Sequence, residues 1–426
     1  MIKKVKGTLD ILPDEMALWH VIENTARDTS EKYGFGEIRF PTFEQSALFK
    51  RGVGDSSDIV QKEMFTLSDR DGNELCLRPE GTACIARSVI ENGLFNEPMP
   101  LKLYYISNFF RYEKPQAGRS REFYQFGVEM FGSSLPSADA SVISLADSVI
   151  KKTGVRADLF INSIGCKNCR PNYHKILVNY LEENADSLCG TCRERLKLNP
   201  LRILDCKNPE CQKIALGAPK TIDYLCDDCK NHFSILKETL TNLGISFEIN
   251  PGLVRGLDYY TKTVFEFISR DIGAQGTICG GGRYDGLIEQ LGGPSLCGIG
   301  FGMGITRLIL AMKKAAELEE CPLPKKASPK IYIAPMGESA GFFSSKLAYD
   351  LRSRGVSAEF DVMGRSLKSQ MKYADKLGAE FVLVLGENEL SEKVAELKNL
   401  RTGEKYPINL SFASDDIYAV ISESKL

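Results

Sequence analysis

The amino-acid sequence predicts a larger α+β domain, with an antiparallel sheet flanked by helices, followed by a small α/β domain. Three observations support this division. Segments with the strand-like alternation of apolar and polar residues dominate up to about residue 165 and resume after 245. The stretch 318–329 has the proline and lysine content of a linker. Beyond it, strand-like and helix-like segments alternate, as they do in βαβ units.

The first element is predicted to be an amphipathic helix over 16–32, which follows Pro13-Asp14 and ends before Gly34 and Gly36. Its apolar positions have helical spacing: Ala17, Leu18, Val21, Ile22 and Ala26. We expect a strand at 37–40. From there to about 165 the sequence predicts mostly strands, with one helix near 139–152.

Two alternating runs, 101–111 and 122–131, predict a β-hairpin. The second run places Gln125, Gly127 and Glu129 on one face of its strand. Glycine weakens a strand, and a ligand lying against the backbone is one reason to have it there. The alternative interpretation is a polar face turned to solvent, with a bulge at Gly127.

The loop of this hairpin is basic, because it carries Arg111, Lys114, Arg119 and Arg121. Guanidinium and ammonium groups in a loop are suited to phosphate oxygens or to an RNA backbone. A loop whose charges are simply solvated is the alternative. The net charge of the chain is only −2, so any nucleic acid has to be met by such local basic patches.

Residues 166–232 interrupt the strand pattern and contain eight cysteines, after which sheet-like segments resume at 245–250 and 263–268. The spacings are typical of zinc knuckles; they are Cys166-x-x-Cys169, Cys189-x-x-Cys192, Cys206-x4-Cys211 and Cys226-x-x-Cys229. Eight thiols fill two tetrahedral sites, or one site with four to spare. The alternative to a structural zinc ion is a helical insertion with unliganded cysteines.

The last hundred residues predict a small α/β domain with a largely parallel sheet. Its expected elements are strands at 331–334, 357–360 and 381–385 and helices at 340–354 and 367–377. Basic side chains there are candidates for phosphate contacts, namely Arg354, Arg365, Lys368, Lys372 and Lys376.

Several common classes of protein are disfavoured. The phosphate-binding P-loop is excluded because Gly-Lys never occurs in the chain. The glycine run at 298–304 lacks the third glycine of a dinucleotide-binding fingerprint in every register. No apolar stretch of signal-peptide or membrane-spanning length occurs, so we expect a cytoplasmic protein without a membrane partner, with cysteines that are free thiols or metal ligands.

Three segments together resemble the signature motifs of class II aminoacyl-tRNA synthetases. Arg39-Phe40-Pro41-Thr42-Phe43-Glu44 is similar to the first, Phe110-Arg111-Tyr112-Glu113 to the second, and 300–308 to the third. Two further segments, 253–261 and 280–287, are similar to the histidine-specific motifs of the histidyl-tRNA synthetases, and 77–82 is similar to their amino-acid-binding loop. The resemblance covers the chain except for details of the cysteine-rich insertion.

The resemblance implies a site for L-histidine. Glu80, Thr82 and Gln125 would hold the α-amino group, while Glu129 and Tyr260 would hydrogen-bond the two imidazole nitrogens. A site that pairs both nitrogens rejects isosteres, because an unpaired buried polar group costs about 1–3 kcal/mol. Gly81, Arg255 and Tyr259 complete the implied histidine site, although Tyr259 is also interpretable as a core aromatic residue.

The resemblance also implies a site for ATP and Mg²⁺. Arg111 would contact the α-phosphate, Arg307 the γ-phosphate, and Arg255 would stabilise the charge that develops on the α-phosphoryl group, so these three arginines are the implied catalytic residues. Glu113, Arg119, Gly302 and Gly304 complete the implied ATP site. Glycines 300, 302 and 304 would let ATP pack against the strand, since they lack a Cβ.

The implied domains are a catalytic domain of 1–165 and 233–325, the insertion 166–232, the linker 318–329, and an anticodon-binding domain of 330–426. The implied reaction is the ATP-dependent ligation of histidine to its transfer RNA. The implied assembly is a homodimer, with Pro41 at its interface. Two alternatives are a non-catalytic regulatory subunit of ATP phosphoribosyltransferase and a class II synthetase for another amino acid. His20, His174 and His232 lie outside every motif and are expected to be structural or surface groups.

Overall fold

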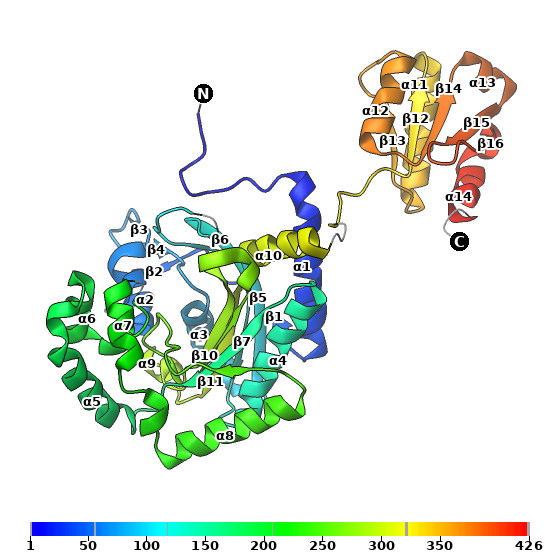
Figure 1. The fold of residues 1–426 in the computed structure, drawn as a ribbon. Coiled ribbons are helices and arrows are strands. Elements are labelled where there is room, and N and C mark those ends of the chain that lie inside the picture. The colour runs from blue at the N-terminus through cyan, green and yellow to red at the C-terminus, as the bar shows by residue number, and fades with distance from the viewer. Residues whose placement is uncertain (1, 55–56, 117, 207, 320–322, 424–426) are drawn as a thin grey trace. The chain divides into compact units, whose positions relative to one another are not determined.

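The computed structural model describes residues 2–54, 57–116, 118–206, 208–319 and 323–423. The chain divides into two compact units, Met1–Lys325 (unit 1) and Lys326–Leu426 (unit 2) (Figure 1). Within the described residues, no helix is long and apolar enough to cross a membrane.

Unit 1 is built on an eight-stranded main sheet in the order β1-β5-β6-β11-β10-β9-β7-β8. The pairings between β5 and β7 are antiparallel, and the short edge strands β1 and β8 pair in parallel. The bounds are β1 Gly36–Glu37, β5 Leu101–Phe110, β6 Glu122–Phe131, β7 Asp158–Ser163, β8 Glu248–Ile249, β9 Thr261–Ile268, β10 Thr277–Arg283 and β11 Gly298–Gly304. The predicted hairpin is therefore β5-β6, whereas only Glu37 of the predicted strand 37–40 lies in a strand, β1.

One face of the main sheet is covered by four long helices. These are α1 (Pro13–Lys32), α4 (Pro136–Lys152), α8 (Asp227–Asn242) and α10 (Ile305–Glu319). Their apolar sides form one core with the side chains of β6, β9 and β11 that point to this face, among them Phe126, Val128 and Phe301. Gln125, Gly127 and Glu129 consequently lie on the opposite face, as their alternation predicts.

The opposite face is partly covered by short elements, of which the sequence predicted strands but not helices. They are helices α2 (Ser46–Val53), α3 (Thr82–Glu91) and α9 (Leu287–Gln290) and a small antiparallel sheet of β2 (Phe43–Gln45), β3 (Thr66–Ser68) and β4 (Glu74–Leu77). The expectation of a single helix between 37 and 165 was wrong. Helices of eight to ten residues show too few apolar repeats to stand out from strands.

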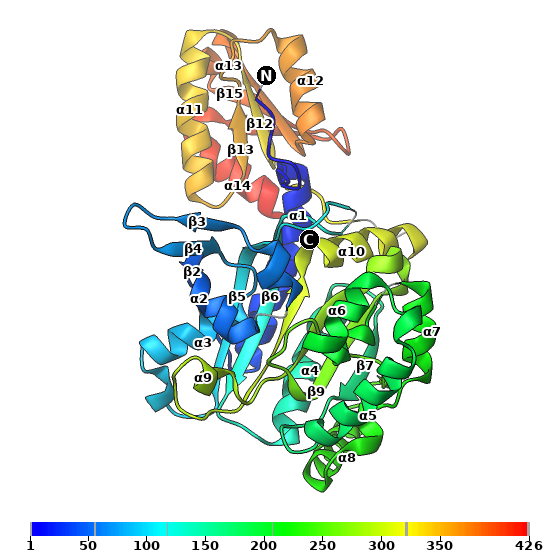
Figure 2. The ribbon, with the colours of Figure 1, turned by 90° about the vertical axis from the view of Figure 1, so that its left-hand side faces the viewer.

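The insertion is helical and has its own small core. It contains α5 (Arg170–Glu183), α6 (Gly190–Leu198), a 3₁₀ turn η4 (Pro200–Ile203), α7 (Pro209–Gly217) and the start of α8. Tyr173, Leu177, Leu181 and Ile203 are buried in that core together with Cys192 and Cys211. Figure 2 shows these helices on one side of unit 1. The expected boundary at 232 falls inside α8, which continues to Asn242 beside the main sheet.

Unit 2 is a five-stranded sheet in the order β13-β12-β14-β15-β16. Only β13, β12 and β14 are parallel, and an antiparallel hairpin, which the sequence did not predict, completes the sheet. The bounds are β12 Ile331–Pro335, α11 Glu338–Ser353, β13 Ala358–Phe360, α12 Leu367–Leu377, β14 Phe381–Leu385, α13 Glu387–Glu392, β15 Val394–Asn399, β16 Lys405–Asn409 and α14 Ala413–Glu423. The expected linker 318–329 overlaps the end of α10, and its residues 320–322 lie outside the described residues.

Candidate active site

A cavity of about 1140 Å³ lies on the face of the main sheet opposite the long helices. Strands β6, β9, β10 and β11, the basic hairpin loop and the insertion all contribute to its wall. Eight of the residues singled out from the sequence line it, namely Arg111, Glu113, Arg119, Gln125, Arg255, Gly302, Gly304 and Arg307. The structure thus gathers most of the residues expected to bind ATP around one space.

The guanidinium groups of Arg111 and Arg307 are held by backbone carbonyls. Arg111 Nε donates to Pro79 O at 2.8 Å, and Arg307 donates to Gly118 O at 3.0 Å and Thr277 O at 2.7 Å. Carbonyls orient a guanidinium without neutralising its charge. Burial, and then the repulsion of Arg119, lowers the pKa of Arg307, which is the signature of a crowded cationic site.

Arg255 is held differently, by an ion pair with Glu266 of β9. Its guanidinium lies over Gly280 of β10, where an added Cβ would come within 2.6 Å of Nη1. Although burial opposes it, the attraction of Glu266 and then of Tyr260 raises the pKa of Arg255. Arg255 is therefore a fixed, permanently charged group on the floor of the cavity.

The expected histidine-binding side chains form a second, buried group behind the cavity. Thr82 Oγ1 donates to Glu129 Oε1 at 2.7 Å, and Tyr259 OH donates to Glu80 Oε2 at 3.3 Å. Glu80 also accepts the backbone N–H groups of Thr82 and Ala83 at the start of α3. The side chains of this group, unlike Gln125 and Arg255, do not line the cavity in the part of the chain that is described. They adjoin it, because Pro79 O binds Arg111 and Tyr260 interacts with Arg255.

Burial controls the protonation of the acids in this group. Burial raises the pKa of Glu129 to about 8, even though Tyr284 OH and Thr82 Oγ1 both donate to its carboxylate. Burial also raises the pKa of Glu80, against the hydrogen bonds from Ala83 and Thr82. Two buried acids with raised pKa values beside a cationic cavity are a typical mark of a functional site.

Two expectations about glycines were wrong. The ring of Tyr105 from β5, and not a ligand, lies over Gly127, where an added Cβ would also come within 2.7 Å of Phe301 O. Tyr105 likewise packs against Gly81. On β11, Gly300 is covered by the carboxylate of Glu129 and does not line the cavity, whereas Gly302 and Gly304 do.

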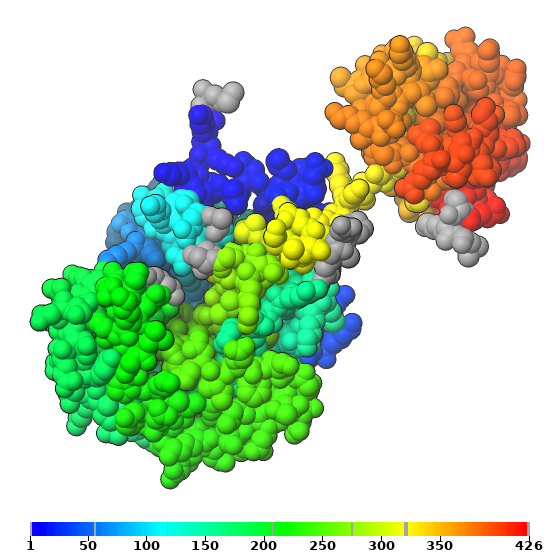
Figure 3. All heavy atoms as spheres, in the orientation of Figure 1, coloured from blue at the N-terminus to red at the C-terminus, as the bar shows by residue number. Residues whose placement is uncertain are grey.

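Sequence reasoning missed Glu266 and every contribution of the insertion to the cavity. Glu266 was detectable, since it is a lone acid in an otherwise apolar half of its strand. The insertion supplies Arg195 and Arg202, each of which pairs with Asp58 Oδ2 at 2.8 Å. In the space-filling view the green atoms of the insertion border the blue and cyan N-terminal part of unit 1 (Figure 3). No local signal in the sequence points to these contacts.

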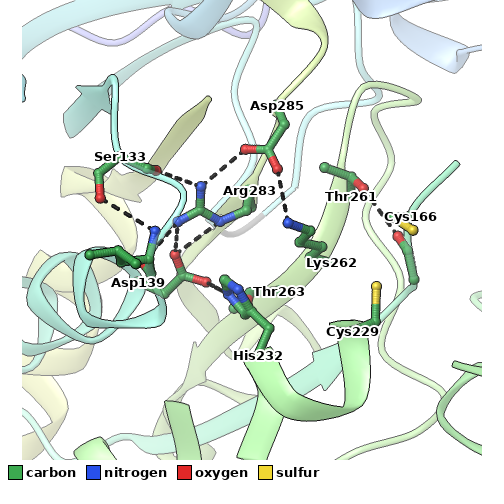
Figure 4. A network of polar contacts seen from close by, with 12 residues as sticks. Ser133, Asp139, Cys166, Cys229, His232, Thr261, Lys262, Thr263, Arg283 and Asp285 are labelled. Carbon is green, nitrogen blue, oxygen red and sulfur yellow. Dashed lines mark hydrogen bonds and ion pairs between the residues drawn. The ribbon is translucent and has the colours of Figure 1, made fainter. Parts of the chain in front are cut away.

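A buried network behind β10 supports the segment that carries Gly280 and Tyr284. Asp139 accepts hydrogen bonds from Arg283 of β10, from Thr263 Oγ1 and from His232 Nε2, the last at 2.7 Å (Figure 4). The pKa of Asp139 is lowered, because the bonds from His232 and Arg283 outweigh its burial. His232 is thus structural, as expected, and joins α8 to this network.

The described cysteines are free thiols, and the eight in the insertion form two groups of four. The inner cysteine group is Cys166, Cys169, Cys226 and Cys229, and the outer cysteine group is Cys189, Cys192, Cys206 and Cys211. In each group the four sulfur atoms lie within 4.8 Å of one another, which is a geometry that a tetrahedral metal ion requires.

Comparison with known proteins gives a consistent family. A model of the histidyl-tRNA synthetase family matches residues 7–165 and 207–308, and a model of an anticodon binding domain matches 330–419. The chain is 53% identical to the histidine–tRNA ligase of Caldanaerobacter subterraneus over 409 residues (96% of this chain and 97% of that one) and 52% identical to that of Acetivibrio thermocellus (95% and 96%).

Solved structures agree. The apo histidyl-tRNA synthetase of S. aureus superposes with a TM-score of 0.82 at 38% identity, covering 97% of this chain and 99% of that one. A Bacillus halodurans protein described as an ATP phosphoribosyltransferase regulatory subunit/histidyl-tRNA synthetase is more distant, with a TM-score of 0.65 at 25% identity, covering 91% and 98%.

Proposed function

The chain belongs to the histidyl-tRNA synthetase family and charges transfer RNA with histidine through a histidyl-adenylate, and from this premise we propose which residues perform each step. The observation that carries the proposal is the convergence of Arg111, Arg255 and Arg307 on one cavity that the buried acids adjoin. The two sets offer cations for a triphosphate and paired polar groups for an imidazole.

The buried group behind the cavity recognises histidine. In the ligand-free arrangement Thr82 occupies one oxygen of Glu129. We propose that the α-amino group of histidine draws Thr82, Glu80 and Gln125 toward itself. The freed oxygen of Glu129 then accepts the imidazole N–H, while Tyr260 donates to the other ring nitrogen. An amino acid whose side chain lacks both nitrogens leaves these buried groups unpaired and is rejected.

Activation joins two anions, because the histidine carboxylate attacks the α-phosphorus of ATP and pyrophosphate leaves. Cationic side chains that are already held in position stabilise the transition state, because they do not have to rearrange during the reaction. Arg111 contacts the α-phosphate and Arg307 contacts the γ-phosphate. Arg255 stabilises the negative charge that develops on the α-phosphoryl group during attack. Mg²⁺, when bound with ATP, neutralises phosphate charge, and the carboxylates of Glu63 and Glu113 in the cavity wall are ligands of the kind it prefers.

Unit 2 and the hairpin loop are the proposed contacts for transfer RNA. Lys368, Lys372 and Lys376 are exposed along one side of α12, with the i, i+4 spacing that aligns phosphate-binding groups. Arg354 and Arg365 are ion-paired with Asp415 and Asp361, so they are the weaker candidates. A homodimer in the cytoplasm with Pro41 at the interface, and at least one structural zinc ion held by the cysteines of the insertion, complete the proposal.

The decisive experiment is histidine-dependent ATP–pyrophosphate exchange with an Arg255→Ala variant. We expect adenylate formation to fall by about 10²–10³, the range for losing one electrostatic stabiliser. Arg270→Ala is the matched control, because Arg270 is 74% exposed, pairs with Asp158 of β7 and does not line the cavity. Near-normal exchange by Arg255→Ala would remove this residue from the proposed mechanism.

The alternative of a regulatory subunit of ATP phosphoribosyltransferase is not favoured. The relatives that match nearly the whole chain at about half identity are histidine–tRNA ligases. The chain also keeps Arg255 in the cavity and a second unit that matches an anticodon binding domain.

A further inference from the structure

The distances between sulfur atoms in the two cysteine groups match those of a tetrahedral zinc site. Within the inner group the Sγ–Sγ distances are 3.7 Å (Cys166 to Cys169) and 3.8 Å (Cys166 to Cys226 and Cys169 to Cys229). In the outer group Cys189 Sγ lies 3.9 Å from Cys206 Sγ. Four sulfurs at about 2.3 Å from one ion are about 3.8 Å apart along the edges of the tetrahedron. A disulfide needs an S–S distance of about 2.05 Å, so these sulfur pairs are not disulfides.

Backbone N–H groups point at sulfur atoms in both groups. Cys166 N donates to Cys169 Sγ at 3.1 Å, and Cys189 N donates to Cys211 Sγ at 3.2 Å. Asn168 N and Asn208 N make longer contacts of the same kind, to Cys166 Sγ and Cys206 Sγ. Donors directed at sulfur favour thiolates, which are the form that binds metal.

The inner cysteine group joins the two ends of the insertion. Cys166 and Cys169 follow β7, whereas Cys226 and Cys229 lie 60 residues later, at the start of α8. One turn beyond Cys229, the same helix carries His232, which binds the buried Asp139 (Figure 4). An ion here would fix the base of the insertion to the core of unit 1.

The outer cysteine group lies directly behind the wall of the catalytic cavity. Asp205 and Gln212, the chain neighbours of Cys206 and Cys211, line the cavity. Arg195 follows Cys192 by one turn of α6, and it pairs with Asp58 together with Arg202. The core of the insertion is small, and a unit of this size usually needs a metal or a disulfide to hold its shape.

We propose that the insertion binds two zinc ions, one in each cysteine group, and that the outer ion holds Arg195 and Arg202 at the catalytic cavity. The inner ion fixes the base of the insertion to unit 1, and the outer ion supports the cavity wall from behind. The metal content is independent of the proposed catalytic roles, whereas the effect on activity rests on the proposed function.

The first test is the zinc content of the full-length chain purified without added zinc. We expect two equivalents in the unsubstituted chain and one in each double variant, Cys206→Ser/Cys211→Ser and Cys226→Ser/Cys229→Ser. Cys297→Ser, outside both groups, should keep two. X-ray absorption at the zinc edge should show four sulfurs at about 2.3 Å. Less than half an equivalent in the unsubstituted chain, or double variants that keep both ions, would overturn the assignment.

The second test separates the outer ion from its arginines. Cys206→Ser/Cys211→Ser should lower histidine-dependent pyrophosphate exchange about tenfold or more, and Arg195→Ala/Arg202→Ala should do the same while keeping two zinc ions. Normal exchange in the arginine variant would overturn the role given to the outer ion, whatever the metal content. Conversely, a chain with two zinc ions and these losses, but with an unaffected Arg255→Ala variant, would contradict only the proposed catalytic roles.

Discussion

Glu129 and Asp139 are both fully buried carboxyl groups, yet their surroundings shift their pKa values in opposite directions. Asp139 accepts hydrogen bonds from His232 and from the guanidinium of Arg283, and these outweigh its burial, stabilise its charged form and lower its pKa. Glu129 has only hydroxyl donors, from Thr82 and Tyr284, so burial dominates and the pKa rises to about 8. The first arrangement is structural, and the second leaves an acid without a cationic partner, which is consistent with the proposed role of Glu129 in binding an imidazole.

The raised pKa of Glu129 predicts a specific pH dependence of stability. The folded chain keeps this proton up to about pH 8, whereas the unfolded chain releases it near the ordinary value of 4.5. Stability contributed by the protonated group is therefore complete below about pH 4.5 and is lost as the pH rises to about 8, by at most about 1.4 kcal/mol per unit. We expect Glu129→Gln to gain thermal stability relative to the unsubstituted chain between pH 5.5 and 7.5.

Scanning calorimetry of both proteins at the two pH values provides the measurement, and Glu122→Gln on the same strand is the control. A difference in melting temperature between Glu129→Gln and the unsubstituted chain that does not change with pH would contradict the raised pKa.

Motif resemblance predicted which residues belong to the site, but not their neighbours. Tyr105 reaches Gly127 from β5, and Tyr284 reaches Glu129 from the position after β10. Such contacts depend on the pairing of β5, β6, β10 and β11, and a single sequence does not fix that pairing.

Glycine-rich strands form the floor of the site. Different side chains of the site lie against several of these glycines. Gly302 lies under Gln125, Gly300 under Glu129 and Gly280 under Arg255. The sequence predicted that β11 allows close approach of ATP. It did not indicate that side chains of the site itself take up part of that room.

A methyl group at Gly280 should displace Arg255 without unfolding the strand. The added Cβ would come within 2.6 Å of the guanidinium, which is the far end of a flexible side chain and can move. We expect Gly280→Ala to lower pyrophosphate exchange by about tenfold to a hundredfold, since a displacement of about 1 Å has effects of this size. Gly286→Ala, in the same motif, meets nothing within 4 Å and should be nearly silent. Equal rates for the two variants would show that Arg255 is not held by this strand.

Helix α4 contributes an acid on which the buried network depends. In Asp139→Asn, Arg283 keeps a buried charge but loses its main partner within unit 1, a change that costs about 3–5 kcal/mol. Asp147→Asn on the same helix removes only a partly exposed i, i+4 pair with Lys151, which is worth about 0–1 kcal/mol. Denaturant unfolding of the two variants measures the contrast, and a similar small loss for both would mean that solvent reaches Arg283.

At the scale of the whole molecule, the two units have separate hydrophobic cores, and the described residues that line the cavity belong to unit 1. The sequence predicted a larger domain, an insertion and a second domain from its strand and helix patterns, its cysteine-rich segment and its linker. It did not predict that the insertion closes one side of the cavity. The pair of Asp58 with Arg195 joins residues 137 apart along the chain, and nothing local marks either one as a partner of the other.

This division predicts that the two steps of the reaction can be separated by truncation. A fragment of residues 1–325 retains the cores of unit 1, the three arginines and the buried group proposed to bind histidine, so it should catalyse histidine-dependent pyrophosphate exchange within about tenfold of the full chain. Charging of transfer RNA should fall by at least a hundredfold, because the contacts of unit 2 with the RNA backbone are lost. Raising the salt concentration with the full chain should weaken charging but not exchange, as a control for those contacts. A fragment that charges transfer RNA normally would show that unit 1 alone recognises it.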